Sequence, residues 1–137
     1  MKRVHIVAAI IYNRDKDKIY ITKRPDHLHK GGFWEFPGGK VEQDEETEQA
    51  ICRELFEEID IKVVKLSHYA HLDYDYPDKS LTFDFYAVEE FNNEPYGKEG
   101  QQGEWVAIDQ LKHYSFPEAN LPVLEMVQKQ RSELISK

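Results

Sequence analysis

The chain has 137 residues, a length that fits one compact domain with its own hydrophobic core and is too short for two. Acidic residues outnumber basic ones by 26 to 18, and the net charge of −8 argues against a nucleic-acid polymer as partner. The single cysteine, Cys52, excludes an internal disulfide framework and favours a buried structural role over thiol chemistry.

Residues 4–12 form a continuous apolar run, which predicts a central strand. The preceding Lys2 and Arg3 resemble the start of a signal peptide. The run is short, however, lacks a small-residue cleavage site and is followed at once by a charged turn at 13–18. We therefore expect a cytoplasmic protein with no membrane segment, and a returning strand over 19–23.

Residues 26–32 are predicted as a loop and 33–36 as a short extended segment. The next segment, Phe36-Pro-Gly-Gly-Lys40, predicts a tight turn, since proline restricts one dihedral and each glycine permits positive φ or a close backbone approach. Most such sequences are only turns. Ahead of a helix, however, a turn of this kind can offer backbone N–H groups and a lysine to phosphate oxygens.

From about Glu46 to Ile59 the spacing predicts an amphipathic helix with two different faces. One face carries the apolar stripe of Ile51, Leu55 and Ile59, suited to a core. The other carries Glu54, Glu57 and Glu58 at i, i+3 and i+4. Acidic helix faces are usually just solvated. Because such close like charges repel, a divalent cation with oxygen ligands, such as Mg²⁺, would compensate them.

The rest of the chain predicts a hairpin of 63–76 and 81–89 turned at 77–80, a loop at 92–103, a strand at 104–108 and a final helix. Alternation of Leu81, Phe83 and Phe85 with polar neighbours predicts a strand with one packed face. The final helix is expected from about Asn120 to Leu134, because Pro122 suits a first helical turn. Strands flanked by two helices predict an α/β (α+β) fold, a mixed sheet between helices, in one domain over 1–137.

The pattern Gly39-x5-Glu45-x7-Arg53-Glu54-Leu55-x-Glu57-Glu58 resembles the Nudix box, the signature of hydrolases that cleave nucleoside diphosphates linked to another group. It departs from the usual box at Asp60, where glycine is normal. Aspartate tolerates the left-handed conformation of a helix end better than most residues. We therefore expect a small stability cost and intact chemistry.

Further segments resemble, in the same order, the branch of the Nudix family that hydrolyses 8-oxo-dGTP; they are 21–24, 35–40, 97–101, 103–105 and 116–123. The similarity extends from about residue 3 to about residue 130. It implies the Nudix fold and an enzyme that converts 8-oxo-dGTP to 8-oxo-dGMP and pyrophosphate, which sanitises the nucleotide pool and prevents mutation. Two alternatives stay open: a hydrolase of other triphosphates such as dCTP or dGTP, and a non-catalytic nucleotide sensor.

The resemblance implies that Mg²⁺ or Mn²⁺ is held by Gly39 (through its carbonyl), Glu54, Glu57, Glu58 and Glu99. Such a metal lowers the pKa of a bound water, which then attacks the β-phosphorus. Glu54 is the first candidate for the general base and Glu99 its competitor, because a ligand and a base both need a carboxylate. Arg53 is expected to form a structural ion pair with Glu45 or Glu57.

The resemblance also implies nucleotide contacts for Arg24, Phe36, Gly38, Lys40, Asp78, Lys79 and Asn120. Lys79 replaces an arginine and lacks its planar fork, so a bidentate contact there is in doubt. The Asn120 amide either reads the oxidised purine, since it can donate and accept together, or caps the last helix; we favour recognition. The six histidines show no metal-ligand spacing and receive no catalytic role. We expect a monomer that binds a nucleoside triphosphate.

Overall fold

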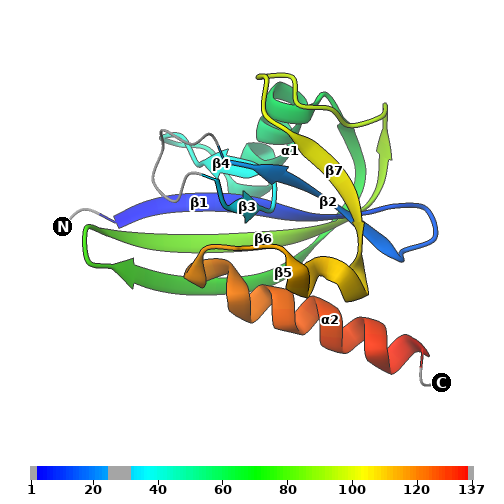
Figure 1. The fold of residues 1–137 in the computed structure, drawn as a ribbon. Helices are drawn as coiled ribbons and strands as arrows, with labels where there is room; N and C mark the ends of the chain where they lie inside the picture. The colour runs from blue at the N-terminus through cyan, green and yellow to red at the C-terminus, as the bar shows by residue number, and fades with distance from the viewer. Residues whose placement is uncertain (1–2, 25–31, 136–137) are drawn as a thin grey trace.

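The computed structural model describes residues 3–24 and 32–135 and shows a mixed sheet with a long helix on each face (Figure 1). The strands are β1 (Arg3–Tyr12), β2 (Lys18–Lys23), β3 (Trp34–Glu35), β4 (Gly38–Lys40), β5 (Lys62–Tyr76), β6 (Lys79–Asn92) and β7 (Gly103–Ala107). The helices are α1 (Thr47–Ile59) and α2 (Leu121–Ile135), with 3₁₀ turns η1 (Ile108–His113) and η2 (Glu118–Asn120). In the described ranges, neither helix is long and apolar enough to cross a membrane.

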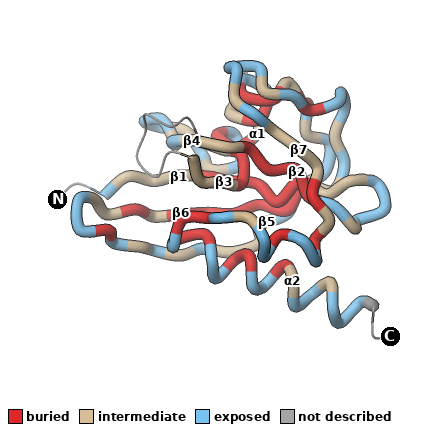
Figure 2. The backbone as a smooth tube through the Cα atoms, in the orientation of Figure 1, coloured by how far each residue is buried: buried red, intermediate tan, exposed pale blue. Residues whose placement is uncertain are grey.

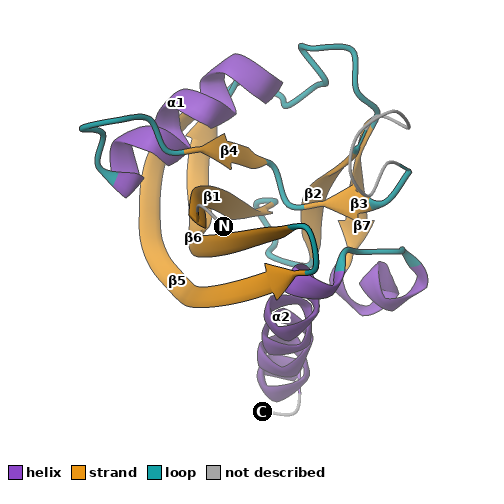
Figure 3. Cartoon of the chain, turned by 90° about the vertical axis from the view of Figure 1, so that its left-hand side faces the viewer, coloured by secondary structure: helices purple, strands orange, loops and turns teal. Residues whose placement is uncertain are grey.

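Strand β1 organises the sheet. The strands follow the order β3-β2-β1-β6-β5, with β4 also paired to β1 and β7 to β2. Only β1 and β6 run parallel among the described pairs; Val7 lies opposite Asp84 on one side and opposite Gly39 of β4 on the other. The predicted mixed sheet between helices is therefore confirmed. It brings β4, which precedes α1, directly against the middle of β1 (Figure 3).

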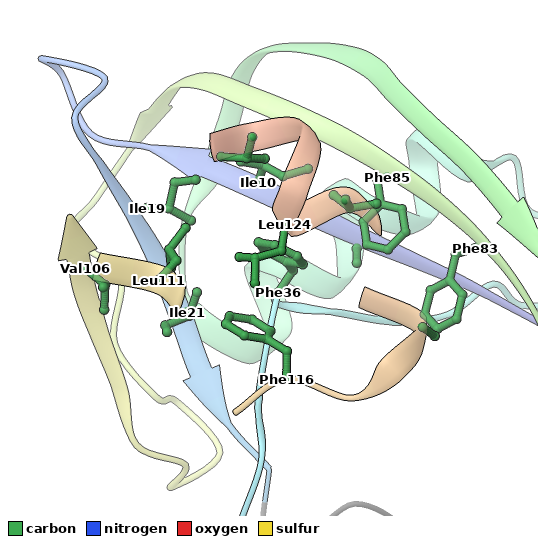
Figure 4. Close-up of a cluster of buried hydrophobic side chains, with 14 of the residues drawn as sticks. Ile10, Ile19, Ile21, Phe36, Phe83, Phe85, Val106, Leu111, Phe116 and Leu124 are labelled. Atoms are coloured by element: carbon green, nitrogen blue, oxygen red, sulfur yellow. The ribbon is translucent and has the colours of Figure 1, made fainter. Parts of the chain in front are cut away.

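The core has two parts because β1 is buried on both faces (Figure 2). Val7, Ala9 and Ile11 pack with α1, whereas Ala8 and Ile10 belong to the cluster under α2. Figure 4 shows that second cluster, in which Phe36 lies among the side chains of β1, β2, β6 and α2. Phe36 is therefore both a core residue and, as described below, part of the pocket wall.

Three sequence predictions need correction. Strand β6 was expected to pack on one face, but Asp84 and Tyr86 are buried as well as Phe83 and Phe85. Tyr86 packs with residues of α1, and Asp84 is surrounded by three histidines. The hairpin turn is shorter than 77–80, since β6 already begins at Lys79. The glycine turn also contains a strand, β4, whose pairing with β1 leaves no local sequence signal. The predicted loop at 26–32 lies outside the described residues except at Gly32.

Both ends of α1 are stabilised by local contacts. Glu46 is the N-cap, and its backbone N–H donates to Gln49 in a capping box. At the other end Asp60 takes the left-handed conformation with φ of 63°, as expected for the residue in the glycine position of the box. Its carbonyl accepts a hydrogen bond from Asn93, so the departure from glycine is accommodated without breaking the helix end.

Three histidines gather around Asp84 on the sheet. His5 Nε2 lies 2.7 Å from Asp84 Oδ2, and His68 Nε2 and His71 Nδ1 each lie 2.8 Å from Oδ1. Burial alone would raise the pKa of Asp84, but the hydrogen bonds from the histidines outweigh it and lower the pKa to about 2. The contact with Asp84 raises the pKa of His71. The cluster ties β1, β5 and β6 together.

Replacing Asp84 by Asn is expected to lower the free energy of unfolding near pH 5 by about 1–3 kcal/mol, because charged hydrogen bonds are lost. The contribution of Asp84 to the free energy of unfolding is fully present above its ordinary pKa of 3.8. It disappears as the pH falls through about 2. The His71 contribution is present below 6.5 and is lost as the pH rises through its raised pKa. Urea denaturation at about pH 3, 5 and 8 checks this. An equal difference at every pH would contradict it.

Candidate metal and nucleotide site

Arg53 connects the carboxylates of the α1 face. Its guanidinium donates two hydrogen bonds to Glu45, at 2.7 and 2.9 Å, in a bidentate pair. It also donates to Glu54 at 2.9 Å and to Glu57 at 2.8 Å. The hydrogen bonds from Arg53 lower the pKa of Glu45 to about 2. Arg53 thus contacts Glu45 and Glu57, the two carboxylates predicted as its alternatives, and also Glu54, which was not predicted.

Glu58 points away from Arg53 and into the protein, where only 8% of it is exposed. Its Oε2 accepts a hydrogen bond from the Gly38 N–H at 3.3 Å, and its Oε1 accepts one from the Gln101 side chain at 3.3 Å. Burial, together with the nearby charge of Glu35, raises the pKa of Glu58 to about 8. A carboxylate in this position needs further positive charge to be ionised at neutral pH.

Gly38 and Gly39 are required for close approach rather than for positive φ, since neither has φ in the left-handed region. A methyl group at Gly39 would lie 2.3 Å from the carboxyl carbon of Glu54. One at Gly38 would lie 1.9 Å from the Val7 carbonyl oxygen of β1. Strand β4 is therefore pressed between β1 and the carboxylates of α1.

Glu99 lies on the loop before β7, and its side chain is exposed. This loop is tied to α1, because the Lys98 N–H donates to the Glu58 carbonyl at 2.9 Å. The negative charge of Glu99 acts on both Glu54 and Glu58 and raises the pKa of each, although burial is the larger cause in both cases. The structure therefore brings Glu99 to the same side of the molecule as the α1 carboxylates.

The donor set fits a hard divalent cation in chemistry. The predicted ligands are all oxygen atoms, and the missing side chain at Gly39 lets the Glu54 carboxylate lie directly against β4. The carboxylates of Glu54 and Glu57 are paired with Arg53, and that of Glu58 is paired with the Gly38 N–H and the Gln101 side chain. Accordingly, residues 3–24 and 32–135 contain no group of three His, Cys, Asp or Glu side chains placed to hold a metal ion. When bound, a divalent cation would add positive charge beside Glu54 and Glu57, which Arg53 already contacts.

A pocket of about 250 Å³ opens on the other side of β4. Seven residues predicted to bind the nucleotide or the metal line it: Arg24, Phe36, Gly38, Gly39, Lys40, Lys79 and Asn120. The remaining lining is mostly apolar, from β1, β6 and the end of β5. Gly38 and Gly39 thus border both the pocket and the carboxylates of α1.

Asn120 is 6% exposed and ends η2, where its backbone N–H donates to the Pro117 carbonyl. Its side-chain amide makes no hydrogen bond to any residue within 3–24 or 32–135. In a helix cap, the side-chain oxygen of Asn120 would accept a hydrogen bond from a backbone N–H of α2. A buried amide without a partner at a pocket wall is instead available to a ligand.

Of the remaining residues predicted to contact the nucleotide, three line the pocket and one does not. Arg24 lines the pocket and donates to Glu35 at 2.8 Å, and Lys79 lines the pocket as the first residue of β6. Lys40 is exposed at the rim, and its carbonyl accepts a hydrogen bond from Arg53. Asp78 is exposed in the hairpin turn and does not line the pocket.

Sequence reasoning did not assign roles to Glu35, Gln101 or Tyr76. Glu35 binds Arg24 in the pocket, and Gln101 donates to Glu58. Tyr76 lines the pocket, and its hydroxyl accepts a hydrogen bond from the Ala119 N–H. Glu35 and Gln101 stand inside the matched segments, so position there was an available signal. Tyr76 had none, because its partner is 43 residues away.

Comparison with known proteins identifies the family. A family model described as NUDIX domain matches residues 7–126, which include all the carboxylates described above. The chain belongs to the Nudix family. Nudix hydrolases act on nucleotides and generally need a divalent metal ion. This chain is an enzyme of that family.

Individual relatives cover nearly the whole chain. The 8-oxo-dGTP diphosphatase of Escherichia coli K12 is 44% identical over 124 residues, covering 90% of this chain and 95% of that protein. The CTP pyrophosphohydrolase of the same organism is 34% identical over 125 residues, covering 91% of each. A chain from the structural study of MutT from Aliivibrio salmonicida and Vibrio cholerae is 56% identical with a TM-score of 0.86, covering 94% of this chain and 99% of that one. The predicted Nudix fold is confirmed.

Proposed function

We propose that this Nudix hydrolase converts 8-oxo-dGTP and water to 8-oxo-dGMP and pyrophosphate. The observation that carries the proposal is the Asn120 amide, buried to 6% exposure and without a partner among the described residues, at the wall of a largely apolar pocket beside the carboxylates of α1. An amide can donate and accept together along a purine edge, which suits recognition of an oxidised base. Similarity to the 8-oxo-dGTP diphosphatase of Escherichia coli supports the same substrate.

In the proposed reaction the base enters the pocket and the phosphates extend over β4. Phe36 packs against the base, while Arg24 and Lys40 offer positive charge to phosphate oxygens. Glu54, Glu57, Glu58, Glu99 and the Gly39 carbonyl would hold Mg²⁺ or Mn²⁺. When bound, the ion would supply positive charge to the phosphates and lower the pKa of a bound water. Arg53 keeps Glu54 and Glu57 oriented through its bond to Glu45.

Glu54 is the proposed general base. It accepts the proton from water as the water oxygen bonds to the β-phosphorus. The bond between the β-phosphorus and the oxygen that bridges it to the α-phosphorus breaks, and 8-oxo-dGMP leaves with that oxygen. Its side chain is 20% exposed and held by Arg53, whereas the side chain of Glu99 is exposed on a loop. Glu54 is therefore the better candidate for the base, because its carboxylate is more shielded and is held in one orientation.

Initial rates with Mg²⁺ on 8-oxo-dGTP, dGTP, dCTP and CTP test this function. We expect pyrophosphate release and the highest kcat/KM for 8-oxo-dGTP. Equal efficiency on 8-oxo-dGTP and dGTP would overturn the sanitising role, and preference for a cytidine nucleotide would assign the chain the substrate class named for its other Escherichia coli relative. Absence of turnover with every nucleotide would favour a nucleotide sensor.

Replacing Asn120 by Ala is expected to lower kcat/KM for 8-oxo-dGTP about ten- to hundred-fold more than for dGTP, because one amide pairing with a base is worth roughly 1–3 kcal/mol of discrimination. Parallel kinetics on the two nucleotides and a thermal melt measure both effects. If selectivity is unchanged and the variant loses about 1 kcal/mol of stability, Asn120 is a helix cap instead.

The proposal includes the setting of the enzyme. We infer a monomer, a single domain over 1–137, that acts in the cytoplasm on free nucleotides and binds neither a membrane nor a nucleic-acid polymer. The net charge of −8 supports free nucleotides over polymers, because a polymer would bring many phosphates near an acidic surface. Size-exclusion chromatography with light scattering measures the oligomeric state.

A further inference from the structure

The end of β5 holds the turn that carries Asn120. The Tyr76 hydroxyl accepts a hydrogen bond from the Ala119 N–H at 3.1 Å, and this contact is buried. Tyr76 is 7% exposed and lines the pocket together with Asn120. A residue at the end of a strand thus supports the backbone immediately before the proposed base-reading side chain.

Turn η2 has little support of its own. It is a single 3₁₀ turn, whose hydrogen-bond geometry is poor, and its N-cap Pro117 makes no side-chain cap bond. The Ala119 N–H is among the first donors of this turn and has no carbonyl partner within it. The Tyr76 hydroxyl therefore satisfies a buried donor that would otherwise be left without a bond.

A second tyrosine on β5 contacts the same turn. The Tyr74 hydroxyl donates a short hydrogen bond to the Glu118 carboxylate. The rings of Tyr74 and Tyr76 are tilted against each other with centroids 4.8 Å apart. Two successive residues of η2 are therefore held from one strand, but the Tyr74 contact is exposed to water and the Tyr76 contact is not.

We infer that the Tyr76 hydroxyl is a positioning group for base recognition: it holds η2 so that the Asn120 amide faces the pocket before the nucleotide binds. A preformed turn lowers the ordering cost of binding. Tyr76 does not touch the reacting phosphates in this arrangement, since the carboxylates of α1 lie beyond β4. The inference rests on the proposed function, in which Asn120 reads the base.

The test is Tyr76→Phe, which keeps the ring and removes the hydroxyl. We expect kcat/KM for 8-oxo-dGTP to fall about five- to fifty-fold, mainly through KM, and the preference over dGTP to fall with it. Tyr69→Phe is the matched control, because Tyr69 is also on β5 and donates to Gln130 of α2, whose side chain does not line the pocket. An effect of Tyr76→Phe no larger than that of Tyr69→Phe would overturn the inference.

A double-mutant cycle separates positioning from general stability. If Tyr76 acts through Asn120, then Tyr76→Phe changes the ratio of the two kcat/KM values in the wild-type background and leaves it unchanged in an Asn120→Ala background. A fall in selectivity of equal size in both backgrounds would refute the coupling. A purely structural role would lower thermal stability without changing the ratio.

Binding of 8-oxo-dGMP and dGMP by calorimetry keeps this inference distinguishable from the proposed function. If wild type shows no turnover but binds 8-oxo-dGMP, and Tyr76→Phe weakens that binding in a way that depends on Asn120, the hydrolase proposal fails and the positioning role stands. If turnover is selective and Tyr76→Phe alters neither binding nor selectivity, the hydrolase proposal stands and the positioning role fails. If wild type binds neither monophosphate nor prefers 8-oxo-dGTP, both are overturned.

Discussion

Glu54→Gln is expected to lower kcat by about 10²- to 10⁴-fold, because the substitution removes the proposed general base and a metal ligand together. The fold should be retained. Arg53 keeps its bonds to Glu45 and Glu57, and one of several neighbouring like charges disappears. Pyrophosphate release under saturating substrate measures kcat, and thermal unfolding measures the stability of the variant.

Glu48→Gln provides the matched control. Glu48 is exposed in the first turn of the same helix and is not among the carboxylates that Arg53 binds, so its substitution should leave kcat unchanged. Glu99→Gln completes the set. If Glu99→Gln loses activity as proposed here for Glu54→Gln, while Glu54→Gln retains most of it, the general base is Glu99 and the assignment of Glu54 is wrong.

Gly39→Ala and Gly38→Ala are expected to fail in different ways, although the residues are adjacent. At Gly39 the new methyl group meets the flexible end of Glu54 at 2.3 Å, so Glu54 must move and the fold can adjust. We expect kcat to fall about ten- to hundred-fold with stability nearly unchanged, since a displacement of about 1 Å in a reacting group can cost that much.

At Gly38 the new methyl group meets the backbone of β1, 1.9 Å from the Val7 oxygen and 2.7 Å from the Ala8 Cα. Neither atom can move without disturbing the central strand. We expect a loss of about 3 kcal/mol of stability, at the upper end for overpacking. Urea denaturation and steady-state kinetics on both variants separate the two effects. Full activity of Gly39→Ala would show that Glu54 does not need its present position.

Periodic segments were predictable because their signals are local. The apolar stripe of α1 and the continuous run of β1 depend on residues a few positions apart, and both elements begin and end within one residue of prediction. The left-handed end of α1 at Asp60 was likewise local. Strand β4 was not predictable in this way, because two glycines followed by lysine pair with β1 only when the sheet has formed.

The predicted site residues likewise divide into those whose placement follows from local spacing and those whose contacts depend on tertiary structure. The spacing predicted that Glu54, Glu57 and Glu58 share one helix face. All three lie in α1, but Glu58 is buried together with the apolar residues of that helix. Their pairing did not follow from spacing: Arg53 takes Glu54 and Glu57, while Glu58 turns inward to Gly38. The contacts of the three histidines with Asp84 were not predictable either. Strands β1, β5 and β6 bring these side chains together, and no regular spacing in the sequence relates them.

The sequence by itself determined the family of this protein, because the carboxylates, the glycine pair and Arg53, which match the Nudix box, lie within one short stretch. Only the tertiary structure decided which side chains line the pocket beside them. Asn120 is buried without a partner among the described residues, and the hydroxyl that supports its turn comes from Tyr76 on a distant strand. Such contacts arise from sheet pairing and from the packing of η2 on it, and no local pattern in the chain encodes either.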